Sequence, residues 1–397
     1  MTVHIDLPVA VSSAIQKLNS AGFEAYAVGG CIRDSLLEYQ PDDWDITTSA
    51  TPSEMQAVFA EYRTVETGLQ HGTLMVLLDG MSLEITTYRV DGTYSDGRHP
   101  DGVSFTRALS EDLRRRDFTV NAMAYHPKTG LVDLYDGQAD LAAAIIRCVG
   151  EPYRRFEEDA LRILRALRFS STLGFAMDDA TAQALRALSS TLTKVSVERI
   201  TTEFVKLLCG KDAENVLREY RDIIAEILPE IGDGTDFHLL SVLRPAPSVR
   251  IAALLYAAGV SPVDAEQVMR RLRMDHKTLH EVVLLLTALP RGVYTEDAYL
   301  LRLLRHIGPI LAFDYLAIRE SHKDTIRLLQ QLLDAGACYC LPMLAVNGAD
   351  VMSVGVAEGC AVGRVLNELL DAVMDGVCRN EREALLEYVK KTKKPVQ

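Results

Sequence analysis

The segment EAYAVGGCIRDSLLEYQPDDWDITTSA, residues 24–50, decides the fold that we predict for this chain. It opens with a strand-like run at 24–28, passes through Gly29-Gly30 into a short helix-like stretch at 31–37, and ends in an alternating, strand-like run at 43–48. A glycine pair between a strand and a helix lets the backbone approach a phosphate, at which the helix N–H groups can point. Taken alone, the pair equally fits an ordinary tight turn.

Two aspartates share one face of the second predicted strand. Alternate residues of a strand point to the same side, so Asp43 and Asp45 face one way while Trp44 and Ile46 face the core. Two neighbouring carboxylates repel each other unless a cation lies between them, and Mg²⁺ prefers carboxylate oxygens while keeping waters that phosphates can replace. A solvated polar face explains an isolated Asp-x-Asp pattern equally well, so the surrounding sequence has to decide.

The next two strands form a predicted hairpin. Runs at residues 73–78 and 81–89 are joined by Asp79-Gly80, a typical two-residue hairpin turn. Strands joined this tightly are antiparallel, which argues against an all-parallel, doubly wound sheet.

Glu84 is a candidate third carboxylate of the same site. Leu83 and Ile85 form the apolar face of their strand, so Glu84 lies on the opposite face. If this strand neighbours the one that carries Asp45, the three carboxylates suit phosphoryl transfer by two metal ions.

Length and composition place the chain among ordinary globular proteins. It has 397 residues, which predicts two to three domains, and 48% hydrophobic and 24% charged residues exclude disorder and fibrous classes. No apolar run is long enough for a membrane helix, and the N-terminus lacks a basic stretch typical of a secretory signal. Seven scattered cysteines predict free thiols in the cytoplasm. A net charge of −13 argues against coating nucleic acid by bulk charge, although it allows local basic patches.

The motifs as a set resemble the signature of the class II tRNA nucleotidyltransferases, or CCA-adding enzymes. That group also contains bacterial poly(A) polymerases and lies within the nucleotidyltransferase (DNA polymerase β-like) superfamily. The last of the matching motifs looks like the tail of the Gram-positive type, so the resemblance spans most of the chain. The motifs are GGCIRD (29–34), DWDITTSA (43–50), EITTYR (84–89), DGRHP (96–100), RRDFTVNAM (115–123), DLYDG (133–137), EDALRILRALRF (158–169) and LAVNGADVM (344–352).

The resemblance implies a role for each site residue. Asp43 and Asp45 would hold two Mg²⁺ ions, with Glu84 as the third catalytic carboxylate. Asp117 would favour ribose over deoxyribose, and Asp159 with Arg162 would act as a protein template that pairs with the incoming base. The nucleotide-binding residues implied in this way are Gly29, Gly30, Arg33, Arg116, Asp117, Asp159, Arg162, Arg165 and Arg168.

Physical reasoning supports the template. We expect one amphipathic helix over Glu157–Phe169, in which Asp159 and Arg162 share a face because they are three residues apart. A carboxylate supplies acceptors and a guanidinium supplies donors, so together they can bond the edge of C or A. The same residues also fit a plain helix with internal ion pairs.

The expected fold is α+β, with an N-terminal nucleotidyltransferase head that contains a small mixed or antiparallel sheet, followed by an all-α neck, body and tail. The expected divisions are residues 1–147 for the head, 148–210 for the neck with base recognition, 211–297 for the body and 298–397 for the tRNA-binding tail.

The function implied is addition of CCA to the 3′ end of tRNA from CTP and ATP, with release of pyrophosphate and without a nucleic-acid template. No protein partner and no membrane are expected. Alternatives are a poly(A) polymerase, a partial enzyme that adds only CC or only A, and, more remotely, a non-catalytic RNA-binding protein. In the family, a loop like Asp96–Asp101 helps the change from C to A addition.

Overall fold

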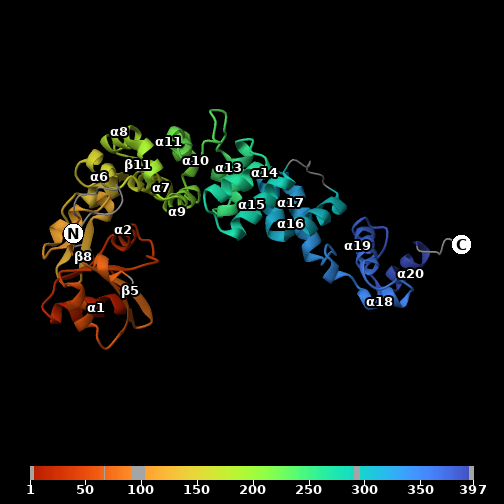
Figure 1. The fold of residues 1–397 in the computed structure, drawn as a ribbon, viewed down its shortest axis with the longest axis horizontal. Coiled ribbons are helices and arrows are strands. Elements are labelled where there is room, and N and C mark those ends of the chain that lie inside the picture. Colours follow the sequence, from red (N-terminus) through yellow and green to blue (C-terminus); the bar gives the residue numbers. More distant parts are fainter. Residues whose placement is uncertain (1–3, 67, 92–102, 290–295, 393–397) are drawn as a thin grey trace. The chain divides into compact units, whose positions relative to one another are not determined.

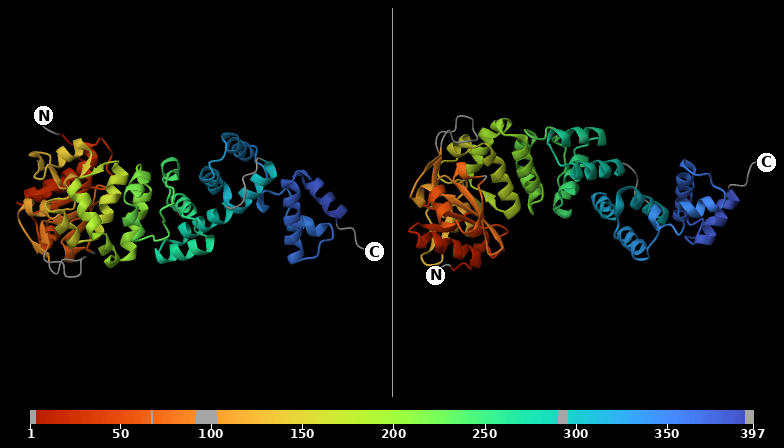
Figure 2. Two further views of the ribbon diagram at one scale, coloured as in Figure 1. Left: turned by 90° about the horizontal axis from the view of Figure 1, so that it is seen from above. Right: turned by 60° about the horizontal axis from the view of Figure 1, so that its bottom comes forward.

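The computed structural model describes residues 4–66, 68–91, 103–289 and 296–392, and the chain forms two compact units, residues 1–233 and 234–397 (Figure 1). The first unit holds the β-sheet and a set of helices, and the second has helices and connecting loops, with no strand among its described residues (Figure 2). This arrangement confirms the predicted α+β class. The loop Asp96–Asp101 lies outside the described residues.

The head contains a seven-stranded sheet in the order β3-β4-β5-β2-β1-β8-β9. Within it β2 and β5 are parallel, whereas its other described neighbours are antiparallel, so the predicted mixed sheet is confirmed. The hairpin is confirmed as well, because Leu78 pairs with Met81 across the turn. The strands of this sheet are β1 Ala25–Val28, β2 Asp45–Thr48, β3 Arg63–Val65, β4 Thr73–Leu78, β5 Met81–Thr87, β8 Met123–His126 and β9 Gly130–Asp133. Two small sheets pair β6 Arg89–Asp91 with β7 Val103–Phe105, and β10 Ile145–Ile146 with β11 Ala176–Met177.

One face of the sheet is apolar because the central strands alternate. Ile46 of β2 pairs with Ala27 of β1 on one side and with Ile85 of β5 on the other, and all three residues are buried. Helix α1 (Val9–Ser20) contacts β1 and β2 and buries Val11 and Ile15 completely or nearly so. Each such aliphatic side chain contributes roughly 1.5–3 kcal/mol of burial free energy. The apolar face thereby fixes which residues point to the other face.

The other face carries polar side chains and is partly covered by α4 (Leu109–Arg114). Val28 of β1 and Ala124 of β8 pack against Leu113 of this helix. Asp45 and Glu84 alternate with the buried residues of β2 and β5 and are exposed. The head thus presents its acidic side chains beside a helix that is anchored in a small apolar cluster.

Some helices of the first unit are interleaved with the strands of the head, and those from α6 onward follow the sheet in a continuous series (Figure 1). The prediction of a single helix over residues 157–169 is wrong. Two helices meet there, with a break at Asp159 and Ala160. The remaining helices of this unit are α2 Gly30–Leu36, α3 Pro52–Val58, α5 Gly137–Ala143, α6 Pro152–Glu158, α7 Leu161–Leu173, α8 Asp179–Leu188, α9 Val197–Leu208, α10 Ala213–Glu219 and α11 Arg221–Ala225, with 3₁₀ turns η1 Leu69–His71, η2 Thr119–Asn121 and η3 Ser189–Lys194.

The second unit is built from helices that pack on their neighbours. Its longest helix bends where Gly308, with φ of 78°, precedes Pro309, which lacks the N–H that would continue the helix. The elements are α12 Leu239–Val242, α13 Pro247–Ala257, α14 Pro262–Arg271, α15 His276–Ala288, α16 Asp297–Ile318, α17 Lys323–Asp334, η4 Leu341–Met343, α18 Gly348–Ser353, α19 Cys360–Met374 and α20 Arg382–Thr392. The four-part division into head, neck, body and tail stays a prediction.

All seven cysteines are thiols rather than disulfides, as the sequence predicts. Among the described residues, no helix combines the length and the apolar composition that crossing a membrane requires.

Candidate active site

The register of β2 and β5 brings the predicted carboxylates to one place. The two strands are parallel neighbours, and Asp45 pairs directly with Glu84. Paired residues of neighbouring strands point to the same face of a sheet, so Asp45 and Glu84 share one face. The strand predicted over 43–48 begins only at Asp45, so Asp43 precedes β2, close enough for its charge to act on the Asp45 carboxyl. The condition set by the sequence, that the strand of Glu84 lies beside that of Asp45, is therefore confirmed.

The electrostatics of this acidic face favour a cation. Asp45 is exposed, yet the protein packed around its carboxyl raises its pKa; Arg116 opposes that rise, and the negative charges of Glu84 and Asp43 add to it. No side-chain hydrogen bond or ion pair joins any of the three carboxylates to a described residue. Oxygen ligands that repel one another fit a divalent cation. Among the described residues, no three metal-binding side chains are gathered closely enough to hold an ion as they stand.

The glycine pair lies beside Arg116. Gly29 has φ of 85° and stands immediately before α2. A Cβ built on Gly29 would lie 2.9 Å from Nη1 of Arg116, whereas one on Gly30 would be at an ordinary 3.7 Å from Nη2 of Arg33. Gly29 is therefore required both by its backbone conformation and by the close approach of the arginine, while Gly30 is not restricted in this way.

Gly29→Ala is expected to destabilise the head by roughly 1–3 kcal/mol, because a side chain is strained at this φ and ψ. It should also weaken CTP binding, since the added methyl group displaces Arg116. Urea unfolding and CTP titration of Gly29→Ala and Gly30→Ala test this. Equal losses in the two variants would contradict the steric explanation.

Arg33 is held firmly within the head. Its guanidinium binds both carboxylate oxygens of Asp34 and donates from Nη1 to Oδ1 of Asn121 at 2.7 Å. It lies 5.1 Å from the centre of the Phe169 ring, which belongs to α7. Arg33 thus links the helix after the glycine pair to the first long helix beyond the sheet.

Asp117 and Arg165 form a buried ion pair. Nη2 and Nε of Arg165 donate to one oxygen of Asp117 at 2.6 and 2.8 Å, and Asn121 donates to the other at 3.2 Å. Burial by itself would raise the pKa of Asp117, but the charge and hydrogen bonds of Arg165, together with Asn121, hold that pKa well below its usual range. The carboxylate is therefore charged at neutral pH and fixed in orientation.

The sequence analysis missed Glu203 of α9. This glutamate is 7% exposed and pairs with Arg165 at 3.4 Å and Arg168 at 2.5 Å. A signal was available, because Glu203 stands among Ile200 and Phe204 on the buried side of its helix. A charged residue on an apolar stripe is unfavourable unless it is paired.

The template residues are placed differently from the prediction. Helix α6 ends at Glu158, and Asp159 is extended, with φ of −147° and ψ of 104°. Its Oδ1 accepts the backbone N–H of Leu161 at 3.1 Å, so the carboxylate caps the first turn of α7. A short polar side chain that bonds nearby backbone competes with continuation of the helix. The shared helix face proposed for Asp159 and Arg162 is therefore wrong.

Both side chains of the predicted template are already engaged. Arg199 of α9, which the sequence analysis also missed, donates to Asp159 at 2.7 Å. Arg162 is 8% exposed and donates to Glu158 at 2.7 Å and to two backbone carbonyl groups. Pairing with a base would require these side chains to share or exchange their partners.

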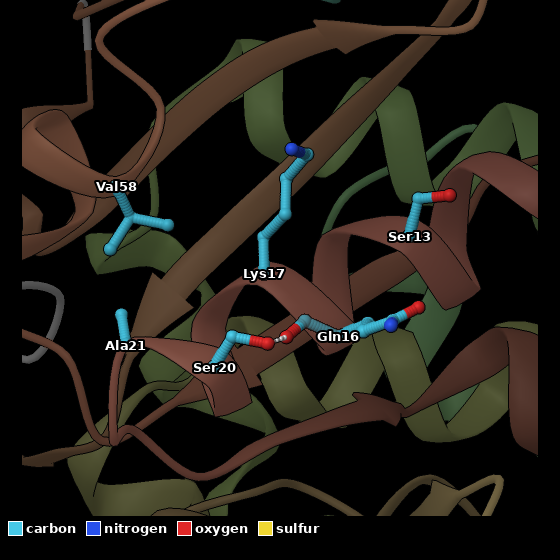
Figure 3. Close-up of a pocket in the computed structure, with 6 residues that line it drawn as sticks. All are labelled: Ser13, Gln16, Lys17, Ser20, Ala21 and Val58. Atoms are coloured by element: carbon cyan, nitrogen blue, oxygen red, sulfur yellow. Dashed lines mark hydrogen bonds between the residues drawn. The ribbon is translucent and has the colours of Figure 1, made fainter.

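A pocket of about 620 Å³ opens along α1 (Figure 3). It is lined mainly by that helix and by Val58 of α3, and Lys17 is its single charged side chain. The Lys17 ammonium lies 4.9 Å from the ring centre of Tyr62. The lining includes neither a carboxylate nor any predicted site residue, so this pocket is separate from the acidic face.

Comparisons with known families agree with the fold. Residues 25–147 match the model of the poly A polymerase head domain, and residues 247–389 match that of tRNA nucleotidyltransferase domain 2. Residues 174–233 match a probable RNA and SrmB-binding site of polymerase A. The fold and the acidic face thus define a nucleotidyltransferase with a poly(A) polymerase-type head.

Relatives that match over nearly the whole chain show which family of nucleotidyltransferases the chain resembles. The chain is 38% identical to a CCA-adding enzyme of Leuconostoc citreum, over 95% of this chain and 94% of that protein. It is 34% identical to one of Enterococcus faecalis, with the same coverage. It resembles the crystal structure of the Bacillus stearothermophilus CCA-adding enzyme in complex with CTP, with a TM-score of 0.80, 32% identity and 96% of each chain covered. The chain belongs to the family of CCA-adding enzymes, which confirms the predicted family and enzyme class.

Proposed function

We propose that this chain adds C, C and A to the 3′ end of tRNA from CTP and ATP. The observation that carries the proposal is the pairing of Asp45 with Glu84 on one sheet face, beside the strand–glycine–helix segment that contains Gly29. Similarity over nearly the whole chain to CCA-adding enzymes supports the same reaction. The B. stearothermophilus relative, whose structure contains CTP, supports the nucleotide class.

In the proposed reaction the 3′-hydroxyl of tRNA attacks the α-phosphate in line and pyrophosphate leaves. Asp43 and Asp45 would hold Mg²⁺, and Glu84 would face the same space as the third carboxylate. Bound divalent ions would lower the pKa of the attacking hydroxyl and offset the charge of the triphosphate. The chain's own contribution is to keep Asp45 and Glu84 on one rigid sheet face, next to Asp43, so that little reorganisation accompanies the reaction.

Nucleotide binding is proposed for the residues around Gly29 and along α7. Arg116 lies next to Gly29 and carries a positive charge that a triphosphate would meet. Asp117 is charged and fixed, as a hydrogen-bond acceptor for a ribose hydroxyl must be. Base selection would then involve Asp159 and Arg162, through exchange of the bonds that they make to Arg199 and Glu158.

The helices beyond the head would hold tRNA by its backbone and shape, which is how double-helical RNA is generally recognised. We retain residues 148–210 as neck, 211–297 as body and 298–397 as tail in this proposal. Local lysines and arginines suffice for such binding, so a net charge of −13 is compatible with it. Action on tRNA places the enzyme in the cytoplasm in this proposal.

Extension of three tRNA transcripts tests the function. The transcripts end in the discriminator base, in C or in CC, and each receives CTP, ATP or both with Mg²⁺. With both nucleotides, all three are expected to stop after CCA when read at single-nucleotide resolution.

Other products would identify the alternatives. Long A tails would show a poly(A) polymerase. A halt at CC, or extension of the CC-ended transcript alone, would show a partial enzyme. No extension of any transcript would contradict the proposal altogether.

A further inference from the structure

A fully buried carboxylate lies behind the proposed nucleotide site and has no role in the reaction described so far. Asp112 of α4 is 0% exposed. Its Oδ1 accepts from Nε and Nη2 of Arg115 at 3.0 and 2.7 Å. Its Oδ2 accepts the hydroxyl of Thr47 at 3.1 Å and lies 3.5 Å from Nη2 of Arg116. A buried charge with this many partners is held in a single place.

The placement of Thr47 connects this carboxylate to the catalytic strand. Thr47 and Asp45 are two residues apart in β2, so they share the face that carries the acidic side chains. Asp112 therefore lies over the same strand, beyond Asp45. From there it reaches Arg116, which follows α4 directly.

The guanidinium of Arg116 lies between Asp112 and Gly29. One side of its guanidinium contacts Asp112, and the other approaches Gly29, to within 2.9 Å of the position a Cβ would take there. Its Nε is buried and has no hydrogen-bond partner among the residues that the structure describes, so this donor can still take an acceptor. The positive charge of Arg116 also acts on Asp45, whose carboxylate attracts the guanidinium. Asp112 supplies a competing anion on the other side of the guanidinium, and its attraction opposes movement of Arg116 toward Asp45.

We propose that Asp112 is a positioning residue, which holds the guanidinium of Arg116 toward the triphosphate and away from Asp45. The inference rests on the proposed role of Arg116 in nucleotide binding and extends it to a residue that contacts no substrate. The two interactions compete for one guanidinium, so loss of Asp112 should weaken nucleotide binding even though the arginine is still present. Binding of tRNA should change little.

A double-mutant cycle tests this, with CTP affinity measured by calorimetry in Mg²⁺ without tRNA. Asp112→Asn is expected to weaken CTP binding about tenfold, and to add less than twofold to the loss already seen in Arg116→Ala. Glu111→Gln removes the neighbouring carboxylate of α4, which pairs with the exposed Arg114, and serves as the matched control, with CTP affinity within twofold of the parent. Under turnover, Asp112→Asn should raise KM for CTP more than it lowers kcat.

The outcomes distinguish the nucleotide-binding role of Arg116 from the positioning role of Asp112. If Arg116→Ala leaves CTP affinity unchanged, the proposed role of Arg116 fails. If Arg116→Ala weakens binding but Asp112→Asn does not, or if the two losses multiply, the positioning role fails.

A measurement on the parent protein covers the case in which Asp112→Asn does not fold. The ¹⁵N signal of the Arg116 Nε–H group, identified by its absence in Arg116→Ala, should be as rigid without CTP as the surrounding backbone. A freely moving guanidinium would overturn the proposal.

Discussion

Asp45→Asn is expected to lower the rate of CMP addition to tRNA by at least about 10²–10³-fold, the typical loss when one preorganised charge at a reacting centre is removed. The side chain keeps its shape and loses its charge, on a face where Glu84 and Asp43 act on the same space. Affinity for tRNA should stay within twofold, because binding of the RNA backbone depends on other residues. Single-turnover extension and a filter-binding titration measure the two quantities.

Asp42→Asn is the matched control for this prediction. Asp42 is exposed and adjacent in sequence to Asp43, three residues before Asp45. It should leave the rate within about twofold, since exposed surface substitutions have small effects. An equal loss of rate in Asp42→Asn and Asp45→Asn would show that the net charge near the site matters, and not the placement of Asp45 beside Glu84.

The acidic face could be predicted from sequence because its causes are local. Strand periodicity alone places Asp45 opposite Ile46, and Glu84 opposite Ile85. The turn Asp79-Gly80 then fixes a hairpin. What periodicity could not supply is the pairing of β2 with β5, which joins segments almost 40 residues apart and depends on packing in three dimensions.

The neighbourhood of the template could not be predicted in the same way. The apolar spacing of residues 157–169 fits one helix, but Asp159 caps a new one and turns the chain there. Arg199 and Glu203 come from α9, about 40 residues later, and an arginine or glutamate in an amphipathic helix usually lies in solvent. Their roles depend on the packing of α7 against α9.

Asp117→Asn is expected to destabilise the first unit by about 3 kcal/mol at pH 7, the lower end of the loss when one partner of a buried ion pair is removed. The lower end applies because Arg165 keeps Glu203 as a second anion. The free energy of unfolding, from the urea transition of the first unit, measures the effect. Because Arg33, Asn121 and Phe169 pack around the same pair, the variant should also weaken CTP binding.

The pH dependence of this loss tests its electrostatic origin. The pKa of Asp117 is lower in the folded protein than in the unfolded chain, so its contribution is fully present above about pH 4 and is lost as the pH falls further. The difference between the parent and Asp117→Asn should therefore shrink between pH 4 and pH 3. Asp117→Asn combined with Arg165→Met removes both charges and should recover most of the stability, because an apolar replacement of a buried pair is often neutral. A constant difference down to pH 3, or no recovery in the double variant, would show that packing around residue 117 matters more than the charge it carries.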